Sequence, residues 1–183
     1  MGFLHSEKDG ICGSCLIEKP KFSRFISCVK YKNEIKSSLS AYKFRNRPDF
    51  HIGFSRLACE VLEKEGLYFD AVVPIPLSKD SLKARGYNQS SLIAKRIAEY
   101  FFADYIGNAL VKIKETKKQS DLKLAERKKN IKGAFAVLDD KKLRGKHILL
   151  VDDIFTTGST MREAAKTIAP YVDEITAFTI ARS

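Results

Sequence analysis

The sequence contains no apolar run long enough to cross a lipid bilayer. A transmembrane helix needs about 20 predominantly apolar residues, so we expect no membrane-spanning segment. The first ten residues, MGFLHSEKDG, also lack the apolar core of a secretory signal. With 183 residues, of which 44% are hydrophobic and 30% charged, the chain is typical of one soluble globular domain with a small additional part. We therefore expect a cytoplasmic protein.

Two common nucleotide-binding motifs are also missing. No lysine follows a glycine in a G-x-x-x-x-G-K frame, and there is no G-x-G-x-x-G segment. These absences disfavour a triphosphate or dinucleotide site. Histidine is scarce, and the three that occur belong to no recognisable catalytic arrangement: His5, His51 and His147.

Cysteine is scarce too, with four residues in all. Without an export signal we expect a reducing environment, in which thiols serve metal binding, redox chemistry or packing rather than disulfides. Cys12 and Cys15 form one C-x-x-C pair, which is half of a structural zinc site. Cys28 and His5 are candidates to complete that site, and redox chemistry or no function are the alternatives. Cys59 lies in an apolar helical pattern, so we expect it in the core.

Positive charge is abundant and concentrated. The formal net charge is +11, yet residues 19–47 hold nine basic residues against one acidic, and residues 112–132 hold nine against three. The rest of the chain is therefore mildly acidic. Two cationic blocks indicate polyanionic ligands such as nucleic acid or pyrophosphate.

The first basic block also contains five aromatic residues: Phe22, Phe25, Tyr31, Tyr42 and Phe44. Positive charge interleaved with aromatic rings is typical of sequence-tolerant binding to single-stranded nucleic acid. The spacing of Ile35, Leu39 and Tyr42 equally favours a helix whose aromatic side faces the core while its lysines face water. The sequence supports both interpretations about equally.

Apolar periodicity predicts helices that alternate with strands along most of the chain. The expected helices run from Tyr31 to before Pro48, over 54–62 up to Gly66, from Ser90 onward, and from about Ser159 to Pro170. The expected buried strands are 70–76, 147–151 and 174–181, with a polar loop at 78–89 and a mobile polar excursion at 112–132. This order implies a right-handed βαβ unit and a mostly parallel sheet, with ligands at the carboxyl ends of the strands.

A hydroxyl-rich segment follows the strand at 147–151. Thr156, Thr157, Gly158, Ser159 and Thr160 lie between that strand and the next helix. Glycine permits a tight turn in which several backbone N–H groups converge, and a helix N-terminus favours an anion. We expect this loop to hold a monophosphate.

Asp152 and Asp153 stand between the strand and this loop. Carboxylates accept hydrogen bonds in pairs, and the vicinal hydroxyls of a sugar supply donors in pairs. A sugar phosphate would satisfy the acid pair and the loop together. A phosphorylated receiver domain lacks such a loop, a D-x-D phosphatase needs its acids two residues apart, and the acids lie too far upstream to cap the helix.

The stretch VDDIFTTGST resembles the phosphoribosyl-diphosphate (PRPP) signature of type I phosphoribosyltransferases. More narrowly, the combination of PIPL, RGYNQ, QSDL and ER-KKN before GAF resembles the ComF family of competence-related phosphoribosyltransferase-like proteins, over roughly residues 30–183. The resemblance implies an α/β phosphoribosyltransferase-like domain at 29–183, with a mostly parallel sheet flanked by helices. Residues 1–28 would form a small appendage with a partial zinc-knuckle pattern.

The resemblance also implies roles for individual residues. Asp152 and Asp153 would hold the ribose hydroxyls as the catalytic acids, Thr156 to Thr160 the 5′-phosphate, and Mg²⁺ would accompany PRPP. The pyrophosphate would contact Ser78, Lys79, Arg85 and Lys118, under a flexible loop that includes Gln119 and Arg127. Members of the family commonly carry two cysteine pairs that bind zinc, whereas this chain has only Cys12 and Cys15, and the missing pair would fall close to or before Met1.

The family resemblance further implies a role in natural transformation, with DNA uptake and handling of single-stranded DNA. A DNA-uptake channel or a helicase would be the partner, which would bring the protein to the inner face of the membrane. No purine or pyrimidine pocket is recognisable in the sequence. Two alternatives therefore stay open: an active transferase on an unidentified acceptor, and a DNA-binding protein whose sugar-phosphate site is regulatory.

Overall fold

Five parallel strands form the main sheet of the protein. The computed structural model describes residues 19–114 and 129–183. The strands are β1 (Arg24–Lys30), β2 (Ala71–Pro74), β3 (Asp104–Tyr105), β6 (His147–Phe155) and β7 (Glu174–Arg182). Their order across the sheet is β1-β7-β6-β2-β3, and every neighbouring pair is parallel. This arrangement confirms the mostly parallel α/β sheet predicted from the sequence.

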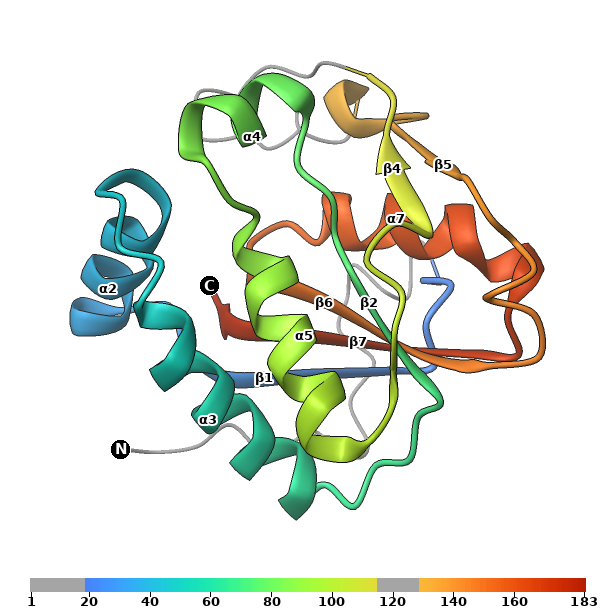
Figure 1. Cartoon of the computed structure of the whole chain (residues 1–183), viewed down its shortest axis with the longest axis horizontal. Coiled ribbons are helices and arrows are strands. Elements are labelled where there is room, and N and C mark those ends of the chain that lie inside the picture. Colours follow the sequence, from blue (N-terminus) through green and yellow to red (C-terminus); the bar gives the residue numbers. More distant parts are fainter. Residues whose placement is uncertain (1–18, 115–128) are drawn as a thin grey trace.

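Helices cover both faces of the sheet (Figure 1). One face carries α2 (Asn33–Phe44), α3 (Phe50–Lys64) and α5 (Gln89–Phe101). The other face carries α7 (Ser159–Ile168), a 3₁₀ turn (Ala169–Tyr171) and the antiparallel pair β4 (Leu110–Lys112) and β5 (Phe135–Val137). In the described part of the chain, no helix has the length and apolar content needed to cross a membrane.

The central strand β6 separates two hydrophobic clusters. Leu149 and Val151 pack with the side of α3 and α5, whereas Ile148 and Leu150 pack with the side of α7. All four side chains are fully buried. Because consecutive residues of a strand point to opposite faces, a strand between two helical layers must be apolar at every position, which explains the run HILLV.

The chain leaves the middle of the sheet in two directions. From β2 it passes through α5 to β3, and from β6 it passes through α7 to β7, on the opposite face. The carboxyl ends of β2 and β6 therefore flank a topological switch point, where open α/β sheets bind ligands. A backbone hydrogen bond of 2.8 Å from Ile75 N to Val151 O holds the two strand ends together.

Strand β1 crosses the expected boundary of the N-terminal appendage. Residues 24–30 pair with β7, so the boundary expected after residue 28 falls inside the sheet. Its apolar core, FISCV, is short and flanked by basic residues. This strand is stabilised by pairing with residues about 150 positions later, and local patterning carries no signal for such a contact.

Two predictions on the polar segments were wrong in part. The polar loop expected at 78–89 contains a helix, α4 (Lys79–Arg85), whose N-cap Ser78 accepts a hydrogen bond from Ser81 N. The polar excursion expected at 112–132 begins at the end of β4, and near its other end Ile131 is buried at 2% exposure. Residues 115–128 of that excursion lie outside the described residues.

Replacing Leu149 with alanine tests the account of the core. Leu149→Ala removes a fully buried side chain from the central strand, so we expect the free energy of unfolding to fall by about 2–5 kcal/mol. Leu82→Ala, at a position 45% exposed on α4, should change it by less than about 0.5 kcal/mol. Urea denaturation of the three proteins measures both values, and equal effects of the two substitutions would contradict the assigned core.

Candidate functional site

Two adjacent carboxylates lie at the carboxyl end of β6. The strand extends to Phe155, beyond the expected end at residue 151, and includes both aspartates. Asp153 is buried, with 6% of its surface exposed, and forms an ion pair with Lys43 of α2 at 2.9 Å from Nζ to Oδ1. Asp152 Oδ1 accepts hydrogen bonds from the Ser90 hydroxyl of α5 at 3.0 Å and from the Asp153 backbone N–H at 2.8 Å. Helices α2 and α5 thus hold the acid pair.

The surroundings of Asp152 disfavour its ionised form. Burial is the largest cause and the neighbouring Asp153 charge the second, and together they raise the pKa of Asp152 to about 7. Lys43 and the hydrogen bonds from Asp153 N–H and Ser90 act in the opposite direction. An additional cation or hydrogen-bond donor beside Asp152 would stabilise its ionised form.

The hydroxyl-rich loop lies directly beside Asp152. One small hollow is lined by Asp152, by the loop residues 156–160 and by Thr179 of β7. Thr157 and Ser159 hydroxyls are 2.9 Å apart, and Ser159 N–H donates to Thr157 Oγ1 at 3.3 Å. Asp152 and the loop 156–160, which we expected to bind the same sugar phosphate, therefore line one hollow.

Gly158 shapes this loop. Its φ of +71° lies in the left-handed region, and it is the N-cap residue of α7. A Cβ at this position would lie 2.3 Å from the Phe155 ring. Backbone conformation and space both require glycine here, and residues 156–160 at the start of α7 line the hollow.

The segment after β2 borders the switch point, which is where open α/β sheets have their ligand crevice. Asn88, the N-cap of α5, accepts from Ser90 N–H at 3.0 Å and donates to the Ile75 carbonyl at 2.9 Å. Asn88 therefore begins the helix and holds it to the end of β2. Ser78 is buried and its hydroxyl bonds to Ser81, whereas Lys79 is exposed.

Arg85 and Gln89 form a polar cluster next to the acid pair. Arg85 Nη1 donates to Gln89 Oε1, and the guanidinium lies 5.3 Å from the centre of the Phe44 ring. Burial lowers the pKa of Arg85, an effect that the nearby Asp153 charge opposes. Gln89 is 1% exposed, and its Nε2 has no hydrogen-bond partner among the described residues. A buried amide donor without a partner beside a cation is suited to an anionic ligand.

The structure brings part of the predicted site together. Asp152 and the loop 156–160 line one hollow, and Arg85 lies near the Asp153 carboxylate. The predicted contacts Lys118, Gln119 and Arg127 lie outside the described residues, as do Cys12 and Cys15, so their roles stay predictions.

Lys43 and Ser90 were not predicted as site residues. Lys43 counted only as part of the basic block, although it lies four residues after Leu39, which is buried in α2. A lysine at this helical spacing from a core residue lies at the edge of the buried face. That signal is visible in the sequence, whereas the contact of Ser90 with Asp152 depends on the packing of α5 against β6.

Cys28 is not available as a zinc ligand. It is fully buried in β1 among apolar side chains, and burial raises the pKa of its thiol. Zinc binds the thiolate, which this environment disfavours.

The prediction that Cys59 is a core residue is confirmed: it is 6% exposed, and burial raises the pKa of its thiol to about 11. Within residues 19–114 and 129–183, no three metal-ligating side chains cluster.

Comparison with known proteins decides the family. The family model for the phosphoribosyl transferase domain matches residues 87–180, which include the acid pair and its loop. The DNA utilization protein YhgH of Escherichia coli (strain K12) is 31% identical over 160 residues, which covers 85% of this chain and 70% of that protein. This chain belongs to the ComF family of phosphoribosyltransferase-like proteins.

Other relatives and solved structures agree with this assignment. Competence protein F of Haemophilus influenzae (strain ATCC 51907 / DSM 11121 / KW20 / Rd) is 27% identical over 179 residues, covering 94% of this ComF chain and 78% of the relative. The structure of the allosteric regulatory enzyme of purine biosynthesis aligns with a TM-score of 0.52 at 19% identity, over 76% of this chain and 29% of that longer chain. At this identity the structural likeness shows the fold alone, and it confirms the predicted type I phosphoribosyltransferase-like architecture.

The raised pKa of Asp152 predicts a pH dependence of stability. Between its ordinary value of 3.8 and about 7, the folded ComF chain keeps a proton on Asp152 that the unfolded chain has lost. This group therefore makes the free energy of unfolding fall as the pH rises through that window. In Asp152→Asn the contribution is absent, so the variant should gain stability relative to wild type as the pH increases from 4 to 7.

Urea denaturation at several pH values measures this difference. Asp173→Asn, which removes an exposed carboxylate, should follow the wild-type curve. A constant difference between Asp152→Asn and wild type across the window would show that Asp152 has an ordinary pKa.

Proposed function

We propose that the crevice between the ends of β2 and β6 binds PRPP together with Mg²⁺. The observation that carries this proposal is the single hollow shared by the Asp152 carboxylate and the hydroxyl-rich loop 156–160. The hollow is only about 20 Å³, so the ligand would lie over it, with an anion at the loop and hydrogen-bond donors at the acid. A ribose 5-phosphate group has both, and PRPP adds a diphosphate on the other side of the ring.

The loop supplies the phosphate half of the site. Gly158 is the N-cap of α7, so the loop lies at a helix N-terminus, and the hydroxyls of Thr157 and Ser159 add donors. Backbone donors at a helix N-terminus bind a phosphate without the desolvation cost of a buried lysine. The 5′-phosphate of PRPP matches this arrangement.

The acid pair supplies the diol half. Asp152 has one oxygen engaged with Ser90 and Asp153 N–H, and Asp153 is paired with Lys43. Two sugar hydroxyls that donate to these carboxylates would favour their ionised forms. Binding should therefore be linked to proton release from Asp152.

Magnesium fits the residues present. Mg²⁺ prefers oxygen ligands and is commonly held by one or two carboxylates together with phosphates of the substrate. The partly buried acid pair, with the pKa of Asp152 raised, provides such oxygens. When bound with the diphosphate, Mg²⁺ neutralises charge on the phosphate oxygens.

The polar cluster on the other side of the crevice suits the diphosphate. Arg85 is a partly buried cation. It donates to the side-chain oxygen of Gln89, whose Nε2 is a donor without a partner among the described residues. Donors of this kind stabilise negative charge on a departing diphosphate. A transferase activity on an unidentified acceptor is therefore compatible with the site, and it remains the alternative to PRPP binding without turnover.

We infer a role in competence-related DNA use from the relatives. Their names are competence protein F, competence protein ComFC and DNA utilization protein. The basic block 19–47 supports contact with single-stranded DNA because Lys30, Lys32 and Lys36 are exposed. Of its aromatic residues, Tyr42 is fully buried and Phe44 is 66% exposed, so the two interpretations of this block each apply to part of it. A DNA-uptake channel or helicase at the membrane would be the partner.

Replacing both acids tests PRPP binding. Asp152→Asn together with Asp153→Asn should weaken Mg²⁺-dependent PRPP binding by at least about tenfold, since both the diol acceptors and the metal ligands are lost. Isothermal titration calorimetry with and without Mg²⁺ measures the change.

The matched control for the acid pair is Asp139→Asn with Asp140→Asn. These adjacent acids pair with Lys142 and Arg144 at the surface, so the double substitution removes the same charge far from the crevice. It should leave PRPP affinity within about twofold of wild type. Unchanged affinity in the first variant would refute the site.

Contact with single-stranded DNA predicts a salt dependence. If several phosphates are neutralised by the basic block, the logarithm of the affinity should fall linearly with the logarithm of the salt concentration, with a slope of about −0.7 per phosphate. Fluorescence anisotropy of a labelled oligothymidylate between low and physiological salt measures the slope. A slope near zero would exclude electrostatic binding of DNA by this protein.

A further inference from the structure

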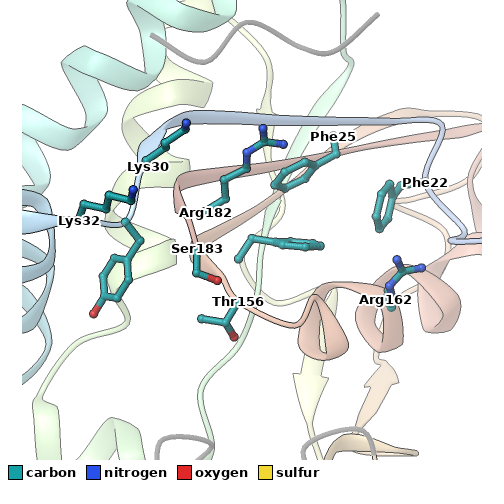
Figure 2. A pocket seen from close by; sticks show the side chains of 10 residues that line it. Phe22, Phe25, Lys30, Lys32, Thr156, Arg162, Arg182 and Ser183 are labelled. Atoms are coloured by element: carbon teal, nitrogen blue, oxygen red, sulfur yellow. The ribbon is translucent and has the colours of Figure 1, made fainter. Parts of the chain in front are cut away.

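A second cavity lies on the side of the loop that faces β1 and β7. Its volume is about 380 Å³, within the range of small-molecule sites, roughly 300–1,000 Å³. Figure 2 shows Lys30 and Lys32 at one end, Phe22 and Arg162 at the other, and Phe25 and Arg182 between them. None of these residues takes part in the crevice between β2 and β6.

The cavity is strongly cationic. Lys30, Lys32, Arg162 and Arg182 line it, and no acidic side chain does so in the described part of the chain. Both lysines are exposed, so their charges are accessible to a ligand. The exposed charges of Lys30 and Lys32 attract an anion such as a phosphate group.

The wall of the cavity is aromatic. The rings of Phe25 and Phe155 lie 4.3 Å apart between centroids, and those of Phe22 and Phe25 lie 6.5 Å apart. These rings and that of Tyr31 are only partly buried, so part of each side chain is accessible from the cavity. Planar groups such as nucleobases stack on aromatic side chains.

The cavity adjoins the candidate phosphate loop. Phe155 and Thr156 line both this cavity and the hollow that contains Asp152. A ligand in the cavity would therefore lie next to a sugar phosphate on the loop, and Phe155 and Thr156 would separate the two. The two sites are neighbours but have different chemistry: the hollow has an acid and hydroxyls, and the cavity has cations and rings.

We propose that this cavity binds a nucleotide unit, with the base on the phenylalanine wall and its phosphate at Lys30 and Lys32. Inorganic phosphate alone would leave the rings unused, and an uncharged apolar ligand would leave the cations unused. The unit can come from a free nucleotide or from a single strand of DNA. The inference deepens the DNA half of the proposed function and rests on it, but it does not depend on PRPP binding.

The chain contains no tryptophan, which makes a specific reporter available. Phe22→Trp places the single tryptophan of the protein at one end of the cavity (Figure 2). We expect saturable quenching of its fluorescence by thymidine monophosphate, by an oligothymidylate, or by both, because a base then stacks beside the indole. Quenching by the mononucleotide identifies a free-nucleotide site, and quenching by the oligomer alone identifies a strand-binding site.

Two pairs of lysines provide the test variants. On the reporter background, Lys30→Ala with Lys32→Ala should lower the affinity at least about tenfold at low salt and reduce the salt slope by about one to two phosphate contacts. Lys141→Ala with Lys166→Ala removes the same charge from exposed positions outside both the cavity and the basic block 19–47, and should change the affinity by less than about threefold. Calorimetry on proteins that retain Phe22 checks that tryptophan itself does not create the site.

The outcomes separate this inference from the proposed function. Asp152→Asn with Asp153→Asn should keep the quenching while it loses PRPP. If neither probe quenches a folded reporter that still binds PRPP, or if the two lysine pairs have equal effects, the cavity is not a nucleotide site and the PRPP proposal is unaffected.

Discussion

The candidate site depends on how the Asp152 and Asp153 carboxylates are held at the end of the buried strand β6. Asp152 and Asp153 follow HILLV, whose side chains fill both layers of the core, so the strand brings the acids to the edge of an apolar interior. Burying charge is costly unless it is paired and hydrogen-bonded. Here Lys43 pairs with Asp153 and Ser90 bonds Asp152, yet the pKa of Asp152 is still raised to about 7. The protein therefore stabilises the Asp152 charge only in part, and a ligand can supply further hydrogen-bond donors or a cation.

The rest of the fold brings the loop and α5 to this pair. The ends of β2 and β6 flank the switch point, Gly158 begins α7 beside the hollow that contains Asp152, and Asn88 ties the end of β2 to the start of α5. The proposed ligand would present hydroxyls to the acids and a phosphate to the loop. Phe155 and Thr156 also border the cationic aromatic cavity, so the end of β6 adjoins both hollows.

The sequence predicted what local patterning and motifs encode. The central strands, the helix after the loop and the pairing of acids with a hydroxyl-rich loop follow from apolar periodicity and the chemistry of VDDIFTTGST. Contacts between distant segments were not predictable in this way. Strand β1 forms because β7 pairs with it. Lys43 reaches Asp153 from α2, which is tied to α5 by the hydrogen bond from the Tyr42 hydroxyl to the Gln89 carbonyl, and α4 depends on a cap by Ser78 inside a mainly polar segment. The side-chain chemistry was visible in the sequence, but the partners are set by the tertiary fold.

The most direct test of this account is a crystal structure of the protein with PRPP and Mg²⁺. The account predicts the 5′-phosphate against the backbone N–H groups and hydroxyls of residues 157–160, with the ribose hydroxyls within hydrogen-bond distance of Asp152 or Asp153. The account also predicts that the diphosphate of PRPP lies near Arg85 and Gln89. Density for the ligand elsewhere, or an empty crevice at saturating PRPP with Asp153 still bound to Lys43 alone, would contradict the central claim.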